Sequence, residues 1–505
     1  MNVTQSFDFE AFARTYDAGK AQVVTTRLVA DLETPVSAFL KIAGNTLNSF
    51  LLESVEGGES RGRYSMIGLA PDLIFRASGD KAEINRTPAQ EKDAFAPCAE
   101  PPLQALRSLL AESAIDLPEG APPMAAGVFG YLGYDMVRQM ERLAPAKPDP
   151  IGVPEALLVR PTIMVVFDAV KDELTVVTPV RPREGVSARA AHEKAQERLE
   201  RVVASLEEAF AHPAPQPFHG DVKAVSNTSP AEYRNMVEKA KDYIRAGDIF
   251  QVVLSQRFES PFSLPPFSLY RALRRVNPAP FLVYFNFDGF SVVCSSPEIL
   301  VRLRNGTVTI RPIAGTRKRG ATIAEDEALA TELLADPKER AEHLMLLDLG
   351  RNDTGRVSRI GSVKVTDSFF IERYSQVMHI VSNVEGKLAE GCDALDVLSA
   401  GFPAGTVSGS PKVRAMEIID ELEKDKRGIY AGAIGYFSAN GEMDTCIVLR
   451  TAVVKDGRMY VQAGAGIVYD SVPENEQQEC VNKASALFRA GEEAVRFAAR
   501  SRNGQ

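Results

Sequence analysis

The sequence lacks the features that mark several large classes of protein. No apolar run approaches the roughly 18 residues of a membrane-spanning helix. The first ten residues include Asp8 and Glu10, where a signal peptide would have a basic and then an apolar stretch. No block of Lys and Arg resembles a nucleic-acid-binding footprint, and the net charge is −9. We therefore expect a cytoplasmic protein that binds neither membranes nor nucleic acids.

Cysteine, histidine and tryptophan are scarce. The five cysteines have no C-x-x-C spacing, which is typical of reduced thiols rather than of a disulfide framework or a zinc site. We expect no catalytic role for them. The chain has five histidines and no tryptophan, and the lack of tryptophan excludes no class of protein by itself.

The length of 505 residues and the apolar content of 45% allow a sizeable core and favour two or more domains. The segment A-H-P-A-P-Q-P-F-H-G, residues 211–220, is rich in proline and is the best candidate for a linker. We predict an N-terminal regulatory or structural region at 1–210, a linker at 211–228 and a catalytic region at 229–505.

Periodicity and turn residues predict a mixture of helices and strands. The expected helices span residues 102–112, 186–210, 229–246 and 268–276, and the expected strands span residues 162–167, 173–177, 281–287, 291–295 and 307–311. Consecutive strands are joined by short turns such as N-F-D-G-F and R-N-G-T. This arrangement favours antiparallel pairing and an α+β fold over a doubly wound sheet.

Four glutamates form two pairs with the same spacing. Glu339 and Glu342 lie in one expected helix, and Glu476 and Glu479 lie in another. Residues three apart share a helix face, so each face presents two carboxylates. Oxygen ligands without nearby cysteine indicate a hard cation, Mg²⁺ rather than Zn²⁺. For either pair alone, a solvated helix face is the more common interpretation.

Two glycine-rich segments resemble nucleotide-binding motifs but differ from them in important ways. G-T-V-S-G-S-P-K, residues 405–412, has Pro411 where a Walker loop has lysine, so ATP hydrolysis is not expected. Ser410 as N-cap and Pro411 as first residue predict a helix through Leu422, whose free N–H groups offer an anion site or simply a helix start. Q-A-G-A-G, residues 462–466, is followed by a loop at 470–475, which argues against a dinucleotide fold.

Several long motifs occur in one order. They are G-D-I-F-Q-V-V-L-S-Q-R-F from Gly247, R-P-I-A-G-T-R from Arg311, E-R-A-E-H-L-M-L-L-D-L-G-R-N-D from Glu339, P-A-G-T-V-S-G-S-P-K from Pro403 and E-N-E-Q-Q-E-C-V-N-K-A from Glu474. With these motifs, and with L-L-E-S at 51–54 and G-Y-L-G-Y-D at 130–135, the chain resembles the chorismate-utilising enzymes, most closely the anthranilate synthase large subunits (component I). The resemblance implies a large antiparallel β-sandwich flanked by helices, with the two halves of the chain interleaved.

The resemblance also implies a role for each motif residue. Mg²⁺ would be held directly by Glu342 and Glu479, and through water by Glu339 and Glu476. The residues implied in catalysis are His379, Glu298, Thr406 and Gln251. Those implied in substrate binding are Tyr430, Arg450, Gly464, Ala465, Gly466, Lys483, Ala314, Gly315 and Thr316. Taken alone, a single histidine such as His379 is more often a buried structural residue, and we assign a structural role to His343.

Two positions distinguish branches of this family. Family members that add water to chorismate have lysine at the position of Gln251, so the glutamine favours ammonia as nucleophile. Aminodeoxychorismate synthases commonly have lysine at the position of Ala314, and alanine offers no nucleophile. These residues favour anthranilate synthase. The segment N-P-A-P-F-L at 277–282 keeps an aminodeoxychorismate synthase as an alternative, and an inactive ligand-sensing homologue is a second alternative.

The resemblance further implies a partner and an inhibitor. No cysteine lies in a recognisable glutaminase motif, so we expect a separate glutamine amidotransferase subunit (component II) that supplies ammonia within a hetero-oligomer. Tryptophan is the expected feedback inhibitor. The residues implied in its binding are Glu53, Ser54, Pro280, Phe281, Leu282, Tyr436 and Cys446.

Overall fold

The computed structural model describes residues 8–56, 60–209, 222–374 and 377–500. The α-helices are α1 (Phe9–Asp17), α2 (Pro35–Ile42), α3 (Pro102–Glu112), α4 (Ala188–Glu207), α5 (Pro230–Arg245), α6 (Pro266–Val276), α7 (Ile323–Ala335), α8 (Pro337–Gly355), α9 (Ala394–Gly401), α10 (Lys412–Leu422) and α11 (Pro473–Arg500). Two 3₁₀ helices are η1 (Tyr134–Gln139) and η2 (Gly405–Val407).

The strands of the first half of the chain are β1 (Gln22–Val29), β2 (Ser49–Glu56), β3 (Ser60–Ser78), β4 (Lys81–Asn85), β5 (Ala96–Pro97), β6 (Gly127–Leu132), β7 (Ala156–Asp168) and β8 (Glu173–Val180). Those of the second half are β9 (Val225–Ser226), β10 (Gln251–Pro261), β11 (Phe281–Asn286), β12 (Phe290–Ser296), β13 (Ile299–Arg304), β14 (Thr307–Ile310), β15 (Ile313–Lys318), β16 (Lys364–Arg373), β17 (Val377–Lys387), β18 (Gly409–Ser410), β19 (Ala433–Ser438), β20 (Met443–Ile447), β21 (Thr451–Lys455) and β22 (Arg458–Ile467).

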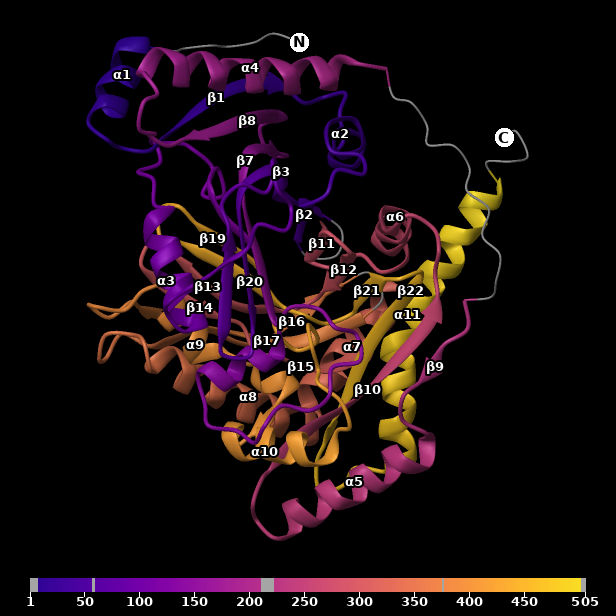
Figure 1. Cartoon of the computed structure of the whole chain (residues 1–505). Coiled ribbons are helices and arrows are strands. Elements are labelled where there is room, and N and C mark those ends of the chain that lie inside the picture. The colour runs from indigo at the N-terminus through magenta and orange to yellow at the C-terminus, as the bar shows by residue number, and fades with distance from the viewer. Residues whose placement is uncertain (1–7, 57–59, 210–221, 375–376, 501–505) are drawn as a thin grey trace.

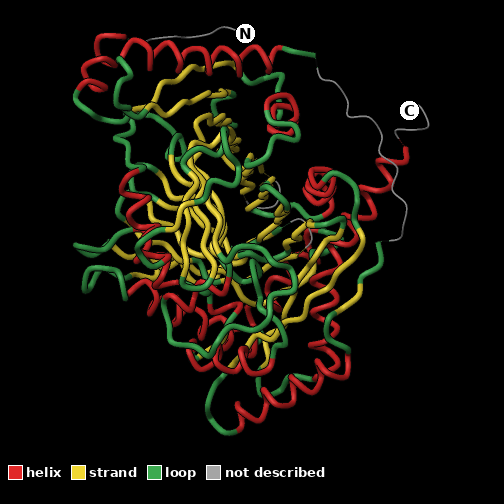
Figure 2. Tube along the Cα trace, viewed as in Figure 1, coloured by secondary structure: helices red, strands yellow, loops and turns green. Residues whose placement is uncertain are grey.

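The sheet branches at β3 and β7, which pair along most of their length. One arm runs from β3 through β2, β11, β12, β21 and β22 to β10. The other arm runs from β7 through β6, β19, β20, β13 and β14 to β17. All of these pairs are antiparallel. Strands occupy the middle of the molecule and helices its periphery (Figures 1 and 2), as the α+β prediction requires.

The two halves of the chain are interleaved within both arms. In the first arm β2 lies between β3 and β11, and in the second β6 lies between β7 and β19. A buried apolar cluster fills the space between the arms, and the rings of Phe50 and Phe129 stack within it at 4.7 Å. Each fully buried phenylalanine contributes about 1.5–3 kcal/mol. The interleaved sandwich is therefore confirmed.

Three helices cover the ends of the strands that carry the predicted site. Helix α8 contacts β15 and β17, α10 contacts β10, and α11 contacts β22. Helix α8 packs on β15 and β17 of one arm and α11 on β22 of the other, and the charge of Glu479 on α11 acts on Glu342 of α8. This arrangement brings the two glutamate pairs together.

Most sequence-predicted elements are present, with small differences at their ends. Helix α3 has the predicted bounds, and α4, α5 and α6 lie within two or three residues of prediction. The predicted linker falls largely on residues 210–221, outside the described residues, and the three-region division stays a prediction. None of the helices that the structure describes is long and apolar enough to cross a membrane.

The start of α10 and the start of α11 differ from prediction. Pro411, not Ser410, is the N-cap of α10, because Ser410 is extended in β18 and pairs with Gln251. Helix α11 begins at Pro473, inside the segment expected to be a loop. Proline is suited to a first helical position, where its missing N–H is not needed. The conclusion against a dinucleotide fold still holds, since β22 pairs antiparallel with both neighbours.

Candidate functional site

Helix α8 presents its two predicted metal ligands from its first two turns. Its N-cap Asp336 accepts hydrogen bonds from the backbone N–H groups of Lys338 and Glu339, at 2.9 and 3.3 Å. The positive end of the helix dipole stabilises carboxylates placed there. Glu339 and Glu342 therefore occupy a favourable position for anions before any cation binds.

Glu342 is the most enclosed of the four glutamates. Its Oε1 accepts a hydrogen bond from Gln251 Nε2 at 3.3 Å. Burial raises the pKa of Glu342, and the neighbouring charges of Glu339 and Glu479 raise it further. Carboxylates from α8 and α11 thus lie close enough to repel one another.

Basic residues partly neutralise this cluster. Glu339 pairs with Arg317 at 3.0 Å, and Glu479 pairs with Lys483 at 2.7 Å. Burial and the charge of Glu479 raise the pKa of Glu476. Over residues 8–56, 60–209, 222–374 and 377–500, no three His, Cys, Asp or Glu side chains lie close enough together to hold a metal ion. The donor set nevertheless fits a hard cation, because its atoms are oxygens that carry unbalanced negative charge.

Glu298 is a buried carboxyl group on the segment between β12 and β13. Burial raises its pKa to about 8, against the lowering effects of a hydrogen bond from Thr406 and of the charges of Lys483 and Arg450. Thr406 Oγ1 donates to Glu298 Oε1 at 3.1 Å. Glu298 is therefore protonated at neutral pH and can donate a proton, which a general acid must do.

His379 lies on β17 opposite Thr316 of β15. Its Nδ1 is 2.9 Å from the carbonyl oxygen of Gly315 and 3.1 Å from Thr316 Oγ1. Because a carbonyl only accepts, Nδ1 carries the proton, and Nε2 keeps its lone pair. Burial lowers the pKa of His379 to about 4, although the Gly315 carbonyl raises it. The imidazole is thus neutral and suited to accept a proton.

The predicted substrate-binding residues surround these two groups. Arg450 is half-buried and has a φ of 46°, in the left-handed region that is uncommon for arginine and often found at functional sites. Lys483 Nζ donates to the Gly464 carbonyl at 3.0 Å. A Cβ at Gly464 would lie 2.9 Å from the Tyr430 hydroxyl, so this position needs glycine.

The remaining predicted residues lie on β10, β15 and β22, in or beside the same region. A Cβ at Gly466 would lie 2.7 Å from Gln251 Nε2, so the backbone closely approaches that amide. Ala465 is buried on β22 beside Gly464. Ala314 is buried on β15 next to Gly315 and pairs with Ile380. The structure thus brings the sequence-predicted catalytic and substrate-binding residues into one region. His343 is fully buried and contacts Ser382 Oγ at 2.6 Å, consistent with a structural role.

A cavity, which we name the Glu53 cavity, lies between the two arms and has a volume of about 530 Å³. All seven residues predicted to bind tryptophan line it: Glu53, Ser54, Pro280, Phe281, Leu282, Tyr436 and Cys446. The carboxylate of Glu53 is already engaged, since it accepts from Arg274 at 2.7 and 3.0 Å and from the Tyr270 hydroxyl at 2.5 Å. Arginines on the cavity wall, among them Arg302 and Arg304, add positive charge.

Comparison with known proteins matches this geometry to a family. The profile of the family described as chorismate binding enzyme covers residues 48–489. The chain belongs to the chorismate-binding enzymes. It is 59% identical over 500 residues to anthranilate synthase component 1 of Cereibacter sphaeroides, covering 98% of this chain and 99% of that protein. It is 50% identical to anthranilate synthase component 1 of Pseudomonas aeruginosa, covering 92% and 94%.

A solved structure agrees with these sequence relatives. The crystal structure of anthranilate synthase component I from Streptococcus pneumoniae superposes with a TM-score of 0.74 at 37% identity, covering 91% of this chain and 98% of that one. This chorismate-binding enzyme therefore shares both sequence and fold with component I proteins along nearly its whole length.

Two residues near the site were not singled out from the sequence. Arg317, the last residue of R-P-I-A-G-T-R, binds Glu339, Glu332 and Asp336. Its place in this motif is the sequence feature that could have identified it. Tyr374 packs its ring edge-on against His379 at 5.4 Å and also lines the Glu53 cavity. No local pattern marks Tyr374, because both contacts depend on the pairing of β16 with β17.

Proposed function

We propose that this chorismate-binding enzyme is an anthranilate synthase component I, which converts chorismate and ammonia to anthranilate, pyruvate and water. The observation that carries the proposal is the pair of groups whose pKa values are shifted in opposite directions, a protonated Glu298 and a neutral His379, beside the half-buried Arg450. Pairs of titratable groups whose pKa values are moved apart are typical of acid–base catalysis. The high identity to proteins named anthranilate synthase component 1 supports the same conclusion.

The chemistry assigns one step to each group. Ammonia forms a bond to C2 of chorismate while the bond from C4 to its hydroxyl oxygen breaks, and Glu298 gives its proton to that oxygen so that water leaves. The ammonium group formed in this step loses a proton to solvent. His379 Nε2 then removes the proton at C2 as the C3–oxygen bond to the enolpyruvyl group breaks, and the departing enolate takes up a proton at its methylene carbon to become pyruvate. The aromatic ring of anthranilate results. Each proton transfer of this kind contributes about 10²–10⁴ in rate.

Charged groups would hold the two substrate carboxylates. We assign the enolpyruvyl carboxylate to Arg450 and Tyr430, since arginine suits a planar carboxylate. Glu342 and Glu479 would hold Mg²⁺ directly, with Glu339 and Glu476 acting through water. When bound, the ion supplies a positive charge for the ring carboxylate and withdraws electrons from the ring.

Gln251 supports ammonia rather than water as nucleophile. Its Nε2 donates to Glu342, and its Oε1 is buried and has no hydrogen-bond partner among the residues that the structure describes. An unpaired amide oxygen can accept from an N–H of ammonia, whereas it is too weak a base to activate water. We propose that the ammonia comes from a glutamine amidotransferase subunit. The component 1 names of the relatives support a second component.

Tryptophan is the proposed inhibitor, and the Glu53 cavity is its proposed site. The apolar wall formed by Pro280 and Phe281 suits an indole ring. Ser54 offers a hydrogen bond, and the wall arginines suit a carboxylate. Because Arg274 and Tyr270 already engage Glu53, an amino group bound there would join an existing network instead of meeting a free carboxylate.

The test is to incubate the purified chain with chorismate, Mg²⁺ and an ammonium salt at alkaline pH, with detection by anthranilate fluorescence and by mass. Anthranilate supports the proposal. Aminodeoxychorismate would favour the alternative that the segment 277–282 leaves open. Isochorismate would show that the inference from Gln251 is wrong. Chorismate binding without any product would indicate a ligand-sensing homologue.

A further inference from the structure

A buried arginine joins three segments of the site although it is not one of the site residues discussed above. Arg427 lies between α10 and β19 and is 3% exposed. Its Nε donates to Glu423 Oε2 at 3.0 Å and its Nη2 to Glu423 Oε1 at 2.6 Å. Nη1 donates to the Val407 carbonyl at 2.7 Å, and Nη2 also donates to the Val253 carbonyl at 2.6 Å.

Each partner of Arg427 adjoins a residue of the site. Val407 follows Thr406, the hydrogen-bond donor to Glu298. Val253 lies two residues after Gln251 on β10. The guanidinium carbon is also 5.6 Å from the centre of the Tyr430 ring. One side chain therefore contacts the η2 segment, strand β10 and the ring of Tyr430.

We propose that Arg427, with Glu423 as its counter-charge, is a positioning residue that fixes Thr406 and Tyr430 in the geometry needed to bind and protonate chorismate. The inference rests on the proposed function and deepens it. Arg427 itself need not touch the substrate. It acts through the hydrogen bond to the Val407 carbonyl and through its contact with the Tyr430 ring.

The chemistry of this contact requires a guanidinium group. Glu423 balances the buried charge, and its Oε1 also accepts from the Ser255 backbone N–H at 2.8 Å and from Ser255 Oγ at 2.9 Å. An arginine presents several donors in a fixed planar fork, so it can bind a carboxylate and two carbonyls at once. A lysine keeps the charge but offers one compact ammonium group. Arg427→Lys thus removes the geometry and retains the charge.

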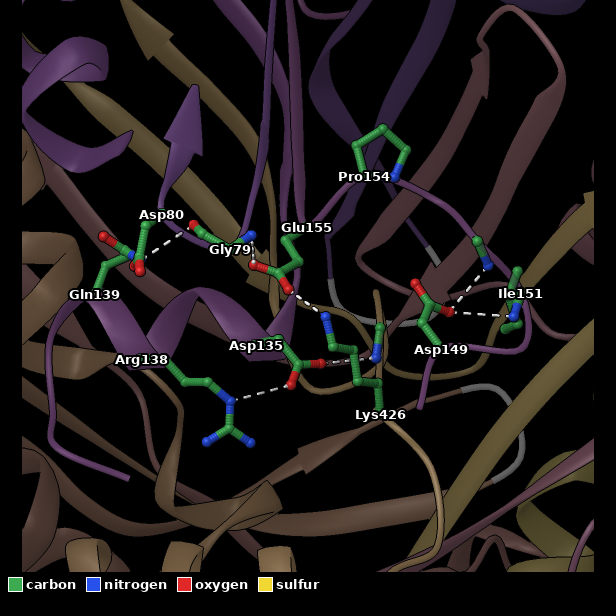
Figure 3. Close-up of polar contacts among 12 residues, drawn as sticks. Gly79, Asp80, Asp135, Arg138, Gln139, Asp149, Ile151, Pro154, Glu155 and Lys426 are labelled. Atoms are coloured by element: carbon green, nitrogen blue, oxygen red, sulfur yellow. Dashed lines mark hydrogen bonds and ion pairs between the residues drawn. The ribbon is translucent and has the colours of Figure 1, made fainter. Parts of the chain in front are cut away.

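The N-terminal half holds the same segment from the other side. Asp135 accepts from the Gly428 backbone N–H at 3.2 Å, and Lys426 pairs with Glu155 (Figure 3). The Tyr134 ring lies 4.7 Å from the Arg427 guanidinium carbon. The contacts of Asp135 with Gly428 and of Lys426 with Glu155 do not involve the Arg427 side chain, so we expect the segment to stay attached in Arg427→Lys. The expected effect is a local shift of Thr406 and Tyr430.

The test compares Arg427→Lys with Arg160→Lys in the full chain. Arg160 is a matched control, since it is 6% exposed and pairs with Asp72 at 2.7 Å but has no contact with the site. Both variants should lower the melting temperature. Arg427→Lys should weaken chorismate binding, measured by calorimetry without ammonia, by about tenfold, and should lower kcat/KM by a similar factor. A tenfold change corresponds to about 1.4 kcal/mol. Arg160→Lys should change neither quantity.

A pH profile distinguishes positioning from a general loss of structure. Glu298 faces Thr406, Lys483 and Arg450, and the bond from Thr406 lowers its pKa. A displaced Thr406 should therefore move the alkaline limb of kcat/KM to higher pH in Arg427→Lys. Adding Thr406→Val to Arg427→Lys should move the limb no further.

If Arg427→Lys binds chorismate as tightly as the unaltered chain and keeps its pH profile, the inference is wrong. If the unaltered chain makes no anthranilate, the proposed function fails, and calorimetry still decides the role of Arg427.

Discussion

Replacing Glu298 by glutamine should abolish most activity and stabilise the fold at alkaline pH. The ordinary pKa of a glutamate is 4.5, and burial raises that of Glu298 to about 8. Below 4.5 the group is protonated in both the folded and the unfolded chain. Between 4.5 and about 8 the unfolded chain loses its proton while the folded chain keeps it, so the free energy of unfolding falls as the pH rises.

The two pKa values limit how much stability Glu298→Gln can gain over the unaltered chain. The difference of 3.5 between a pKa of about 8 and one of 4.5, at about 1.36 kcal/mol for each unit, gives at most about 5 kcal/mol. A glutamine is neutral at every pH and does not incur this loss. Glu298→Gln should therefore be increasingly more stable than the unaltered chain as the pH rises from about 5 to about 8, and should differ little from it at the acidic end.

Chemical denaturation across that pH range measures the difference, with Glu119→Gln at an exposed position as the control for the substitution itself. In the ammonia-dependent assay Glu298→Gln should lower kcat by about 10²–10⁴, because the proton donor is lost. Thr406→Ala should instead shift the alkaline limb of the pH profile upward, since the bond from Thr406 lowers the pKa of Glu298. A stability difference that is constant with pH, or near-normal turnover by Glu298→Gln, would refute the reasoning.

Four further predictions concern the metal, the inhibitor, the ammonia source and the identity of the product. Activity should be lost in EDTA and return with Mg²⁺, and Glu342→Gln should remove nearly all of it while Glu339→Gln, acting through water, is milder; full activity in EDTA would contradict the metal assignment. Millimolar tryptophan should inhibit the unaltered chain, and Ser54→Phe, which fills part of the Glu53 cavity, should be inhibited less; equal inhibition of both would exclude the cavity as the site. The isolated chain should use ammonium salts and not glutamine, and glutamine-dependent turnover without a partner would disprove the separate subunit. Ala314→Lys alone should not convert the product cleanly to aminodeoxychorismate, as mass analysis will reveal.

Local patterns predicted the elements of the fold and the candidate site with different success. The helix at 102–112 and the α+β class follow from periodicity and turn residues, which act over a few positions. The N-cap of α10 was wrong, because the pairing of Ser410 with Gln251 decides its conformation. That pairing joins positions far apart in the sequence. No window of the sequence contains both partners.

Separation along the sequence also distinguishes the site residues that were predicted from those that were not. Glu342 and Glu479 stood out because each belongs to a spaced pair within a helix. Arg427 did not, since its partners Val253 and Val407 come from a distant strand and from η2. Such contacts become visible only when the order of strands in the sheet is known. A buried arginine is then the signal, because its charge needs several partners.

The Glu53 cavity and the catalytic groups share two segments of the chain, the connection from β12 to β13 and the residue that follows β16. Pro297 and Ile299 line the cavity, and Glu298 lies between them. Tyr374, which follows β16, lines the cavity and packs against His379. We therefore expect a ligand that moves either wall to displace Glu298 or the Tyr374 ring that packs against His379. Because coupling between two sites is reciprocal, we expect a substrate that fixes Glu298 and His379 to weaken a ligand that requires these walls to move.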